Sequence, residues 1–182
     1  MGATGAVGEI MRDILEERKF PVKDIKFLAS ERSKGKKMKY QGRDVEIEVL
    51  SPDSFKGVDI VLASAGASVS KEYVKHILDA KALIIDNSSA FRMDDDVPLV
   101  VPEVNPEDIR LNKGIIANPN CSTIIMLVPI KPIHDKAKIK RIVVSTYQAT
   151  SGAGAKGMME LEQQDKDWAA GKEPKVEKFA YQ

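Results

Sequence analysis

Residues 114–130, GIIANPNCSTIIMLVPI, contain the pattern that decides the fold. Residues 114–117 form a short apolar run typical of a buried strand, and residues 123–130 form an apolar run typical of the start of a helix. Residues 118–120, two asparagines around a proline, favour a turn between them. The sequence therefore predicts a strand that turns directly into a helix, as in α/β proteins.

The only cysteine of the chain, Cys121, lies at this turn. A sulfur in the first turn of a helix faces unpaired backbone N–H groups and the positive end of the helix dipole, which favour the thiolate. A reactive cysteine is one interpretation. The other is a small buried apolar residue, as most single cysteines are. These residues alone leave both interpretations open.

Composition limits the possible functions. Of the 182 residues 43% are hydrophobic, and 28 basic residues against 27 acidic ones give a formal net charge of +1. This balance gives no general electrostatic reason to expect binding to nucleic acid or to a membrane. One cysteine excludes a disulfide within the chain and a cysteine-rich zinc site, and we expect no bound metal. No apolar run approaches the roughly 18 residues of a membrane span, and no signal peptide is evident, so we expect a cytoplasmic protein.

Strand and helix patterns alternate before this turn. Strands are predicted at residues 25–29, 45–50, 58–64 and 82–86, and a helix at 71–80. Polar loops of small residues follow the last two strands, and ligands of open parallel sheets bind beyond the carboxyl ends of the strands. We therefore predict an α/β fold with a Rossmann-like, doubly wound, mostly parallel sheet and a ligand site beside these loops.

The chain begins with MGATGAVG, in which Gly2, Gly5 and Gly8 precede an apolar helical stripe. Glycines at this spacing let a pyrophosphate approach the backbone and the N-terminus of a helix. The motif requires a preceding strand, and only Met1 precedes it. The glycines are therefore either a nucleotide-binding turn whose first strand is missing or a flexible terminus. Because that strand is central, its loss should expose its neighbours and leave the turn unanchored.

A basic loop, SERSK at residues 30–34, follows the strand predicted at 25–29. It lies at about the distance from the glycine turn at which a dinucleotide ribose is contacted. Two hydroxyl groups together with Arg32 and Lys34 favour a 2′-phosphate, and hence NADP, although Glu31 argues against it. The alternative is a solvated basic loop that continues to residue 37.

Arg92 and the two histidines give less specific signals. Arg92 lies in AFRMDDDVP, where it could bind an anionic substrate or pair with the acidic residues 94–96, and these residues alone favour the ion pair. His76 lies in a predicted helix and His134 in a basic segment, so we interpret both as structural or solvated. A base beside Cys121 is therefore not evident.

The last third of the chain continues the alternation. A strand is predicted at 139–147, followed by Gln148 and the loop SGAGAKG, and a helix is predicted from about 156 to 170. Beyond this helix the sequence becomes polar and ends in KVEKFAYQ.

Four motifs in this order and spacing resemble a known family: GATGAVG, NSSAFRMDDDVPLVVPEVNPEDI, ANPNCST and STYQATSGAG. Together they resemble aspartate-semialdehyde dehydrogenase of the bacterial type, over essentially the whole chain. Glyceraldehyde-phosphate dehydrogenases carry a different cysteine context, and N-acetyl-glutamyl-phosphate reductases usually have glycine before their cysteine. Short-chain dehydrogenases share the GATG opening but need a Tyr-x-x-x-Lys pair, which this sequence lacks.

The resemblance implies an NADPH-dependent reductive dephosphorylation of L-aspartyl-4-phosphate to L-aspartate 4-semialdehyde plus phosphate, in lysine, threonine and methionine biosynthesis. It implies that Cys121 is the nucleophile that forms a thioester and that Gln148 positions the reacting group. It assigns phosphate binding to Arg92 and Asn120, which reverses the preference for an ion pair at Arg92. It assigns NADP binding to Gly5, Ala6, Val7, Ser30, Arg32 and Ser33, with further contacts expected from Ser64, Gly66, Ser88, Ser151 and Gly152.

The sequence also departs from the family. Family members are roughly twice as long, begin with a strand that is missing here, and take their acid/base histidine from a second domain that would begin near the last five residues. We expect an NADP-binding domain at residues 1–120, the incomplete start of an α+β catalytic and dimerisation domain at 121–182, and a homo-oligomer at full length. The chain alone is expected to be inactive. Two alternatives stay open: a nucleotide-binding fragment without turnover, and an acyl-phosphate reductase for another substrate such as N-acetyl-glutamyl phosphate.

Overall fold

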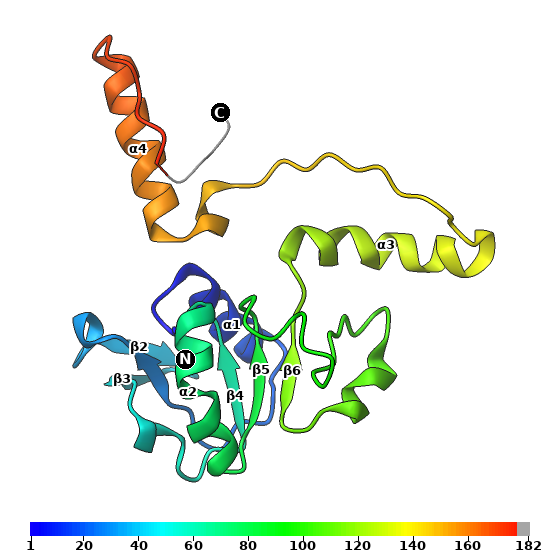
Figure 1. Cartoon of the computed structure of the whole chain (residues 1–182). Helices are drawn as coiled ribbons and strands as arrows, with labels where there is room; N and C mark the ends of the chain where they lie inside the picture. Colours follow the sequence, from blue (N-terminus) through cyan, green and yellow to red (C-terminus); the bar gives the residue numbers. More distant parts are fainter. Residues whose placement is uncertain (178–182) are drawn as a thin grey trace. The chain divides into compact units, whose positions relative to one another are not determined.

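Two three-stranded β-sheets form the centre of the first part of the chain (Figure 1). The computed structural model describes residues 1–177, and the chain divides into two units, Met1–Ile142 and Val143–Gln182. Residues 178–182, near which the second family domain was expected to begin, lie outside the described residues.

One sheet is entirely parallel, with the strand order β4-β5-β6. Its strands have the apolar sequences expected of a sheet that is covered on both faces, and they are β4 (Ile60–Ala63), β5 (Leu83–Asp86) and β6 (Ile115–Ala117). Helix α2 (Ala67–Asp79) connects β4 to β5 and buries Ile77 in the same cluster as Ile84. The strands predicted at 58–64, 82–86 and 114–117 are confirmed.

The other sheet is mixed, with the strand order β1-β3-β2. Strand β1 (Phe27–Ala29) runs parallel to β3 (Arg43–Val49), and β2 (Lys37–Tyr40) runs antiparallel to β3. The β2–β3 turn has positive φ at Gln41 (48°) and Gly42 (75°), as a two-residue hairpin requires. Strand β2 is absent from the sequence prediction because its exposed lysines resemble a solvated loop, although they alternate with buried side chains.

Residues 1–3 join the two sheets. The Met1 nitrogen donates to Leu62 O (2.8 Å), and Ser64 N donates to Met1 O (3.1 Å). On the other side, Gly2 N donates to Leu28 O (2.9 Å). Every residue of β1 is buried and the turn is bonded on both sides, so the expectation of an unanchored glycine turn and of an exposed β1 is wrong. Through these hydrogen bonds residues 1–3 connect the carboxyl ends of β1 and β4. At the opposite end of β4, the side chain of Ile60 is 45% exposed.

The glycine turn leads into helix α1 (Ala6–Glu17). The helix confirms the predicted pattern, and Leu15 packs against the apolar cluster that contains Phe27 and Tyr40. The rest of its apolar stripe is open among the described residues, since Val7, Ile10 and Ile14 are 41, 58 and 42% exposed. Within this unit α1 is therefore held at its two ends: Leu15 packs against the cluster near its C-terminus, and the glycine turn is bonded to β1 at its N-terminus.

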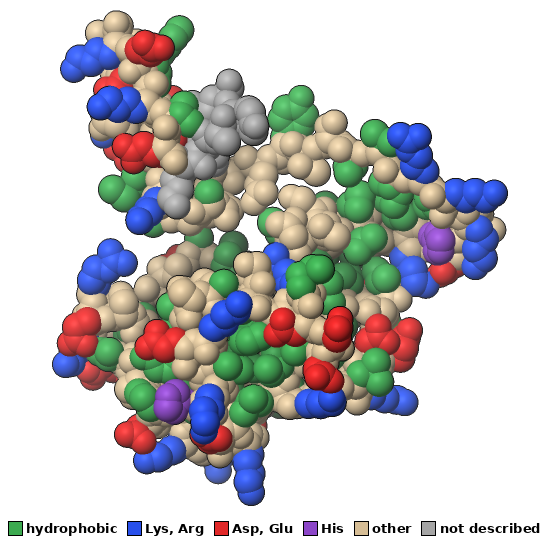
Figure 2. All heavy atoms as spheres, viewed as in Figure 1, with side chains coloured by type: hydrophobic (Ala, Val, Ile, Leu, Met, Phe, Trp, Pro, Cys, Tyr) green, Lys and Arg blue, Asp and Glu red, His purple; other side chains and the backbone are tan. Residues whose placement is uncertain are grey.

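Four short 3₁₀ helices lie in the described connections: η1 (Glu31–Ser33), η2 (Pro52–Phe55), η3 (Pro106–Leu111) and η4 (Thr150–Ala153). On the face shown in Figure 2, acidic and basic side chains are interspersed, in agreement with the formal net charge of +1. Within residues 1–177 no helix is both long and apolar enough to cross a membrane.

Helix α3 (Cys121–Ala137) begins four residues after β6 and confirms the predicted strand-turn-helix unit. The strand predicted at 139–147 is wrong: residues 138–149 form neither helix nor strand (Figure 1). A strand needs a neighbour for its N–H and C=O groups, and none of the described strands pairs with this segment. The predicted helix at 156–170 is confirmed as α4 (Ala155–Ala169) in the second unit.

Candidate active site

Cys121 is the first residue of α3, and its side chain is exposed. The interpretation of Cys121 as a small buried residue is therefore wrong. This position places the sulfur at the N-terminal end of the helix. The arrangement suits a nucleophile that an incoming substrate can reach.

Asn120 forms the N-cap of α3. Its Oδ1 accepts hydrogen bonds from Ser122 N (3.0 Å) and Thr123 N (3.3 Å), which satisfies two of the unpaired amides of the first turn. Within the described residues its Nδ2 has no hydrogen-bond partner. That amide nitrogen is therefore the group of Asn120 that can donate to an anion beside Cys121.

Arg92 connects two loops at the carboxyl ends of the parallel sheet. Its Nε donates to Asn118 O (2.9 Å) and its Nη2 donates to Asn87 O (3.1 Å). The ion pair with residues 94–96 is wrong, since none forms among the described residues. Asp96 instead pairs with Lys113, whose hydrogen bond and charge lower the pKa of that carboxyl. The remaining N–H groups of Arg92 are left to bind an anion.

Two asparagines complete this connection, and the sequence prediction omitted both. Asn118 donates from Nδ2 to Asn87 Oδ1, and its backbone N donates to Asp86 O (2.8 Å). Asn118 lies three residues before Cys121. Both lie in polar loops that follow predicted strands, and this position could have marked them as site residues. Nothing in the sequence indicates that they form a hydrogen bond, because they are 31 residues apart.

The glycine turn packs closely against its surroundings. A Cβ on Gly8 would lie 2.4 Å from Gly2 O, and a Cβ on Gly2 would lie 2.9 Å from Ala65 N. Gly5 is the N-cap of α1, and no side chain caps this helix. The interpretation as a flexible terminus is therefore wrong. The first amides of α1, at Ala6 and Val7, are left for an anionic ligand, which fits a dinucleotide pyrophosphate.

The basic loop lies against this turn. Ser33 is buried, and its Oγ lies 3.4 Å from Thr4 Oγ1, a contact that the sequence prediction omitted. Glu31, which argued against NADP, pairs with Lys34 (3.1 Å). Arg32 is exposed and has no ion pair among the described residues, and Ser30 precedes it as the N-cap of η1. This arrangement fits a 2′-phosphate, because one guanidinium is left without an internal anion.

The remaining predicted cofactor contacts of the first unit follow β4 and β5. Ser64 has a buried hydroxyl without a hydrogen-bond partner among the described residues, which fits a site that receives a polar ligand. Gly66 is the N-cap of α2 with φ of 94°, a conformation that favours glycine. Ser88 is buried and donates to Asp86 Oδ2 (2.6 Å), so its hydroxyl proton is already engaged.

Gln148, Ser151 and Gly152 belong to the second unit. A Cβ on Gly152 would lie 1.9 Å from Gln148 Nε2, so glycine at this position lets the Gln148 amide lie against the backbone. The roles of these three residues beside Cys121 and the nicotinamide stay predictions.

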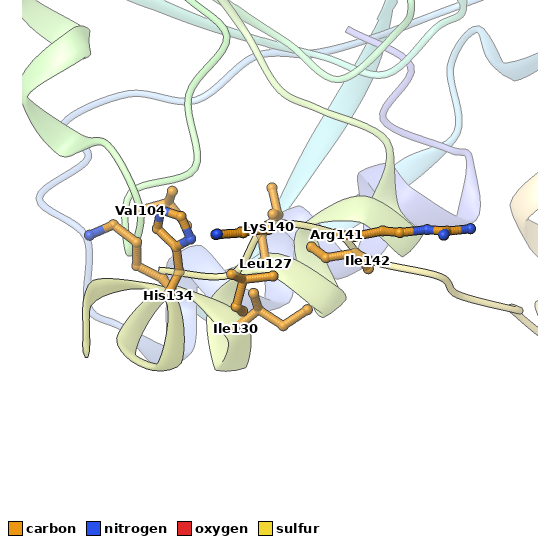
Figure 3. Close-up of a pocket in the computed structure, with 9 residues that line it drawn as sticks. Val104, Leu127, Ile130, His134, Lys140, Arg141 and Ile142 are labelled. Atoms are coloured by element: carbon orange, nitrogen blue, oxygen red, sulfur yellow. The ribbon is translucent and has the colours of Figure 1, made fainter. Parts of the chain in front are cut away.

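A pocket of about 340 Å³ lies between α3 and the segment that follows it (Figure 3). Apolar side chains of Val104, Leu127 and Ile130 line it, together with Lys140 and Arg141. His134 also lines it and is exposed, in agreement with its interpretation as solvated. None of the residues predicted for the active site lines this pocket. Across residues 1–177, no group of three or more His, Cys, Asp or Glu side chains is placed to hold a metal ion.

Comparison with protein families gives two matches. The semialdehyde dehydrogenase NAD-binding domain matches residues 1–112, and the semialdehyde dehydrogenase dimerisation domain matches residues 130–182. The aspartate-semialdehyde dehydrogenase of Aquifex aeolicus is 57% identical over 100% of this chain and 55% of its own length. The chain therefore spans about half the length of the curated relatives that it matches.

Solved structures agree with these matches. The crystal structure of Vibrio cholerae aspartate-semialdehyde dehydrogenase II complexed with ASA has a TM-score of 0.91 and 48% identity, covering 100% of this chain and 55% of that one. The Candida albicans enzyme with NADP has a TM-score of 0.63 and 32% identity, covering 75% and 46%. These matches confirm the resemblance seen in the four motifs, and the chain belongs to the semialdehyde dehydrogenase family.

Proposed function

We propose that the protein that carries this chain is an NADPH-dependent reductase of L-aspartyl-4-phosphate, which forms L-aspartate 4-semialdehyde and phosphate. The observation that carries the proposal is the exposed Cys121 at the start of α3, directly after a turn that Arg92 holds. An acyl phosphate needs a nucleophile and an anion site side by side, and this turn supplies candidates for both.

The chemistry follows from these groups. The Cys121 sulfur attacks the acyl carbon and forms a C–S bond, while the C–O bond to phosphate breaks and phosphate leaves with the electron pair. The free N–H groups of Arg92 and Asn120 Nδ2 bind the phosphate oxygens and stabilise the charge that develops on them. When bound, NADPH would supply the hydride for the thioester carbon; the C–S bond then breaks, which releases the semialdehyde and returns the electron pair to the Cys121 sulfur. Gln148 holds the reacting carbonyl in place during these steps.

The cofactor residues are also proposed from fit. Gly5, Ala6 and Val7 present the uncapped start of α1 to the pyrophosphate, and Arg32 with Ser30 and Ser33 binds the 2′-phosphate. Ser64, Gly66 and Ser88 lie after strands of the parallel sheet, where the nicotinamide is expected, and Ser151 and Gly152 add contacts from the second unit. The crystal structure of the similar Candida albicans enzyme with NADP supports this choice of cofactor.

We further infer an NADP-binding domain at 1–120 and the start of a catalytic and dimerisation domain at 121–182, in a homo-oligomer. The matches to an NAD-binding and a dimerisation domain support both inferences. We interpret the two sheets as parts of one doubly wound sheet, because residues 1–3 bond to both β1 and β4.

A substrate comparison tests the proposed function. The protein is incubated with NADP, phosphate and either L-aspartate semialdehyde or N-acetyl-glutamate semialdehyde, and NADPH formation is followed by absorbance. We expect NADPH from the aspartyl substrate alone. Faster NADPH formation from the N-acetyl-glutamyl substrate would show that the protein reduces a different acyl phosphate.

A further inference from the structure

Asp86 is a fully buried carboxylate at the end of β5, the central strand of the parallel sheet. Among the described residues no Lys, Arg or His forms an ion pair with it. Burying an unpaired carboxylate is costly, and an apolar side chain of similar size would often stabilise a core as well or better. Stability alone therefore gives no reason for a carboxylate here, and its hydrogen bonds indicate what it does.

Three donors surround the carboxylate. Ser70 Oγ on α2 donates to Oδ1 (2.8 Å), Ser88 N donates to Oδ1 (3.2 Å), and Ser88 Oγ donates to Oδ2 (2.6 Å). Two of the three come from Ser88, the second residue of the loop after β5. The backbone N–H and the hydroxyl of Ser88 both donate to this one side chain, so Asp86 fixes the orientation of Ser88.

Ser88 transmits this constraint along the loop. Its Oγ accepts a hydrogen bond from Ala90 N (3.1 Å), and both Ala90 and Phe91 are buried in a cluster with Ala117 of β6. The next residue is Arg92. It therefore directly follows a turn that the Ser88 hydrogen bonds and the burial of Ala90 and Phe91 hold in place. Its two hydrogen bonds reach Asn87 O at the start of this loop and Asn118 O before Cys121.

We propose that Asp86 is a positioning residue: through Ser88 it holds the 87–92 turn so that Arg92 faces an anion beside Cys121. This inference rests on the proposed function, because it concerns the anion site assigned there. Asp86 acts by hydrogen-bond geometry and does not touch the substrate.

The two serines provide a matched test. Ser70→Ala and Ser88→Ala each remove one hydroxyl from the same carboxylate, but only Ser88 lies on the path to Arg92. Cys121 is the only cysteine, so its alkylation by iodoacetamide in the 182-residue chain reports on this site alone. The measured quantities are the alkylation rate and the concentration of inorganic phosphate that halves it.

We expect Ser88→Ala and Asp86→Ala to raise that phosphate concentration about threefold to thirtyfold, and Ser70→Ala to leave it within about twofold. Asp86→Asn should behave like the native chain, because its amide can accept at Oδ1 and donate to Ser88 Oγ. Thermal unfolding verifies that each variant is folded. Ser88→Ala keeps two of the three donors to the Asp86 carboxylate, which are Ser70 Oγ and the backbone N–H of residue 88.

Equal responses of Ser70→Ala and Ser88→Ala, or an Asp86→Asn variant that behaves like Asp86→Ala, would overturn the proposed role of Asp86. Failure of the proposed function has a different result. If phosphate does not slow alkylation of the native chain, the anion site itself is refuted. The change in alkylation rate between the two serine variants then still decides whether Asp86 acts on the Cys121 turn.

Discussion

The substitution Gly8→Ala in the glycine turn has two opposing effects on the free energy of unfolding, and the sign of the measured change shows which effect is larger. Gly8 lies in the first turn of α1, where alanine is intrinsically favoured over glycine by about 1 kcal/mol. Against this, the new Cβ would lie 2.4 Å from Gly2 O and 2.8 Å from Ala3 O. Both contacts are with backbone atoms, so no side-chain rotation relieves them.

The steric effect should prevail. Relief requires the turn to shift by roughly half an ångström in a close-packed region. Gly2 N and Ala3 N both donate to Leu28 O (2.9 and 3.2 Å), so the shift also weakens hydrogen bonds worth about 1 kcal/mol each. Overpacking of this kind typically costs about 1–3 kcal/mol. After the gain in helix propensity we expect a net loss of about 2 kcal/mol, or about 4–8 °C in the unfolding midpoint.

Thermal unfolding followed by circular dichroism measures this loss, with Gly5→Ala as the matched control. A Cβ on Gly5 would meet no atom closer than 3.5 Å, and its φ of −83° suits any residue. We expect Gly5→Ala to stay within about 0.5 kcal/mol of the native chain, because a poorer N-cap and a stiffer unfolded chain offset each other. A Gly8→Ala midpoint at or above the native value would refute the close packing of the turn.

Three further substitutions test other parts of the account. Arg32→Ala should weaken NADPH binding at least about tenfold and NADH binding much less, measured by fluorescence titration; equal losses would show that this loop does not bind the 2′-phosphate. Tyr40→Phe should raise the free energy of unfolding by about 1 kcal/mol, since the buried Tyr40 hydroxyl has no partner among the described residues; a loss would reveal a missing partner. Asn120→Asp should keep the helix cap, and hence the unfolding midpoint, but weaken phosphate protection of Cys121, because a negatively charged oxygen replaces the Nδ2 donor. Unchanged protection would exclude Asn120 from the anion site.

The sequence predicted the parts of the fold that local patterns determine. Apolar runs of three or four residues next to turn formers predicted β4, β5 and β6, and the asparagine and proline at 118–120 predicted the start of α3. The prediction failed where a secondary structure depends on hydrogen bonds to another segment of the chain. The segment 139–147 has the composition of a strand, yet a strand exists only if another strand accepts its hydrogen bonds.

The site shows the same division. The turn residues around Cys121 are close in sequence and were predicted together. The contacts that hold this turn are not: Asn87 pairs with Asn118 across 31 residues, and Thr4 lies beside Ser33 across 29. The residues around Arg92 favoured an ion pair and only the family resemblance favoured an anion site, because the carbonyl groups that Arg92 contacts, Asn87 O and Asn118 O, belong to two loops that are distant in sequence.

The central claim is that Cys121 carries the acyl group, and trapping this group tests it most directly. The protein that carries this chain is incubated with L-aspartate semialdehyde and NADP without phosphate, quenched in acid and digested for mass spectrometry. The account predicts one acyl adduct, on the peptide that contains Cys121, which disappears when phosphate is added and never forms in Cys121→Ser. An adduct on another residue, or NADPH formation at the native rate by Cys121→Ser in the presence of phosphate, would contradict it.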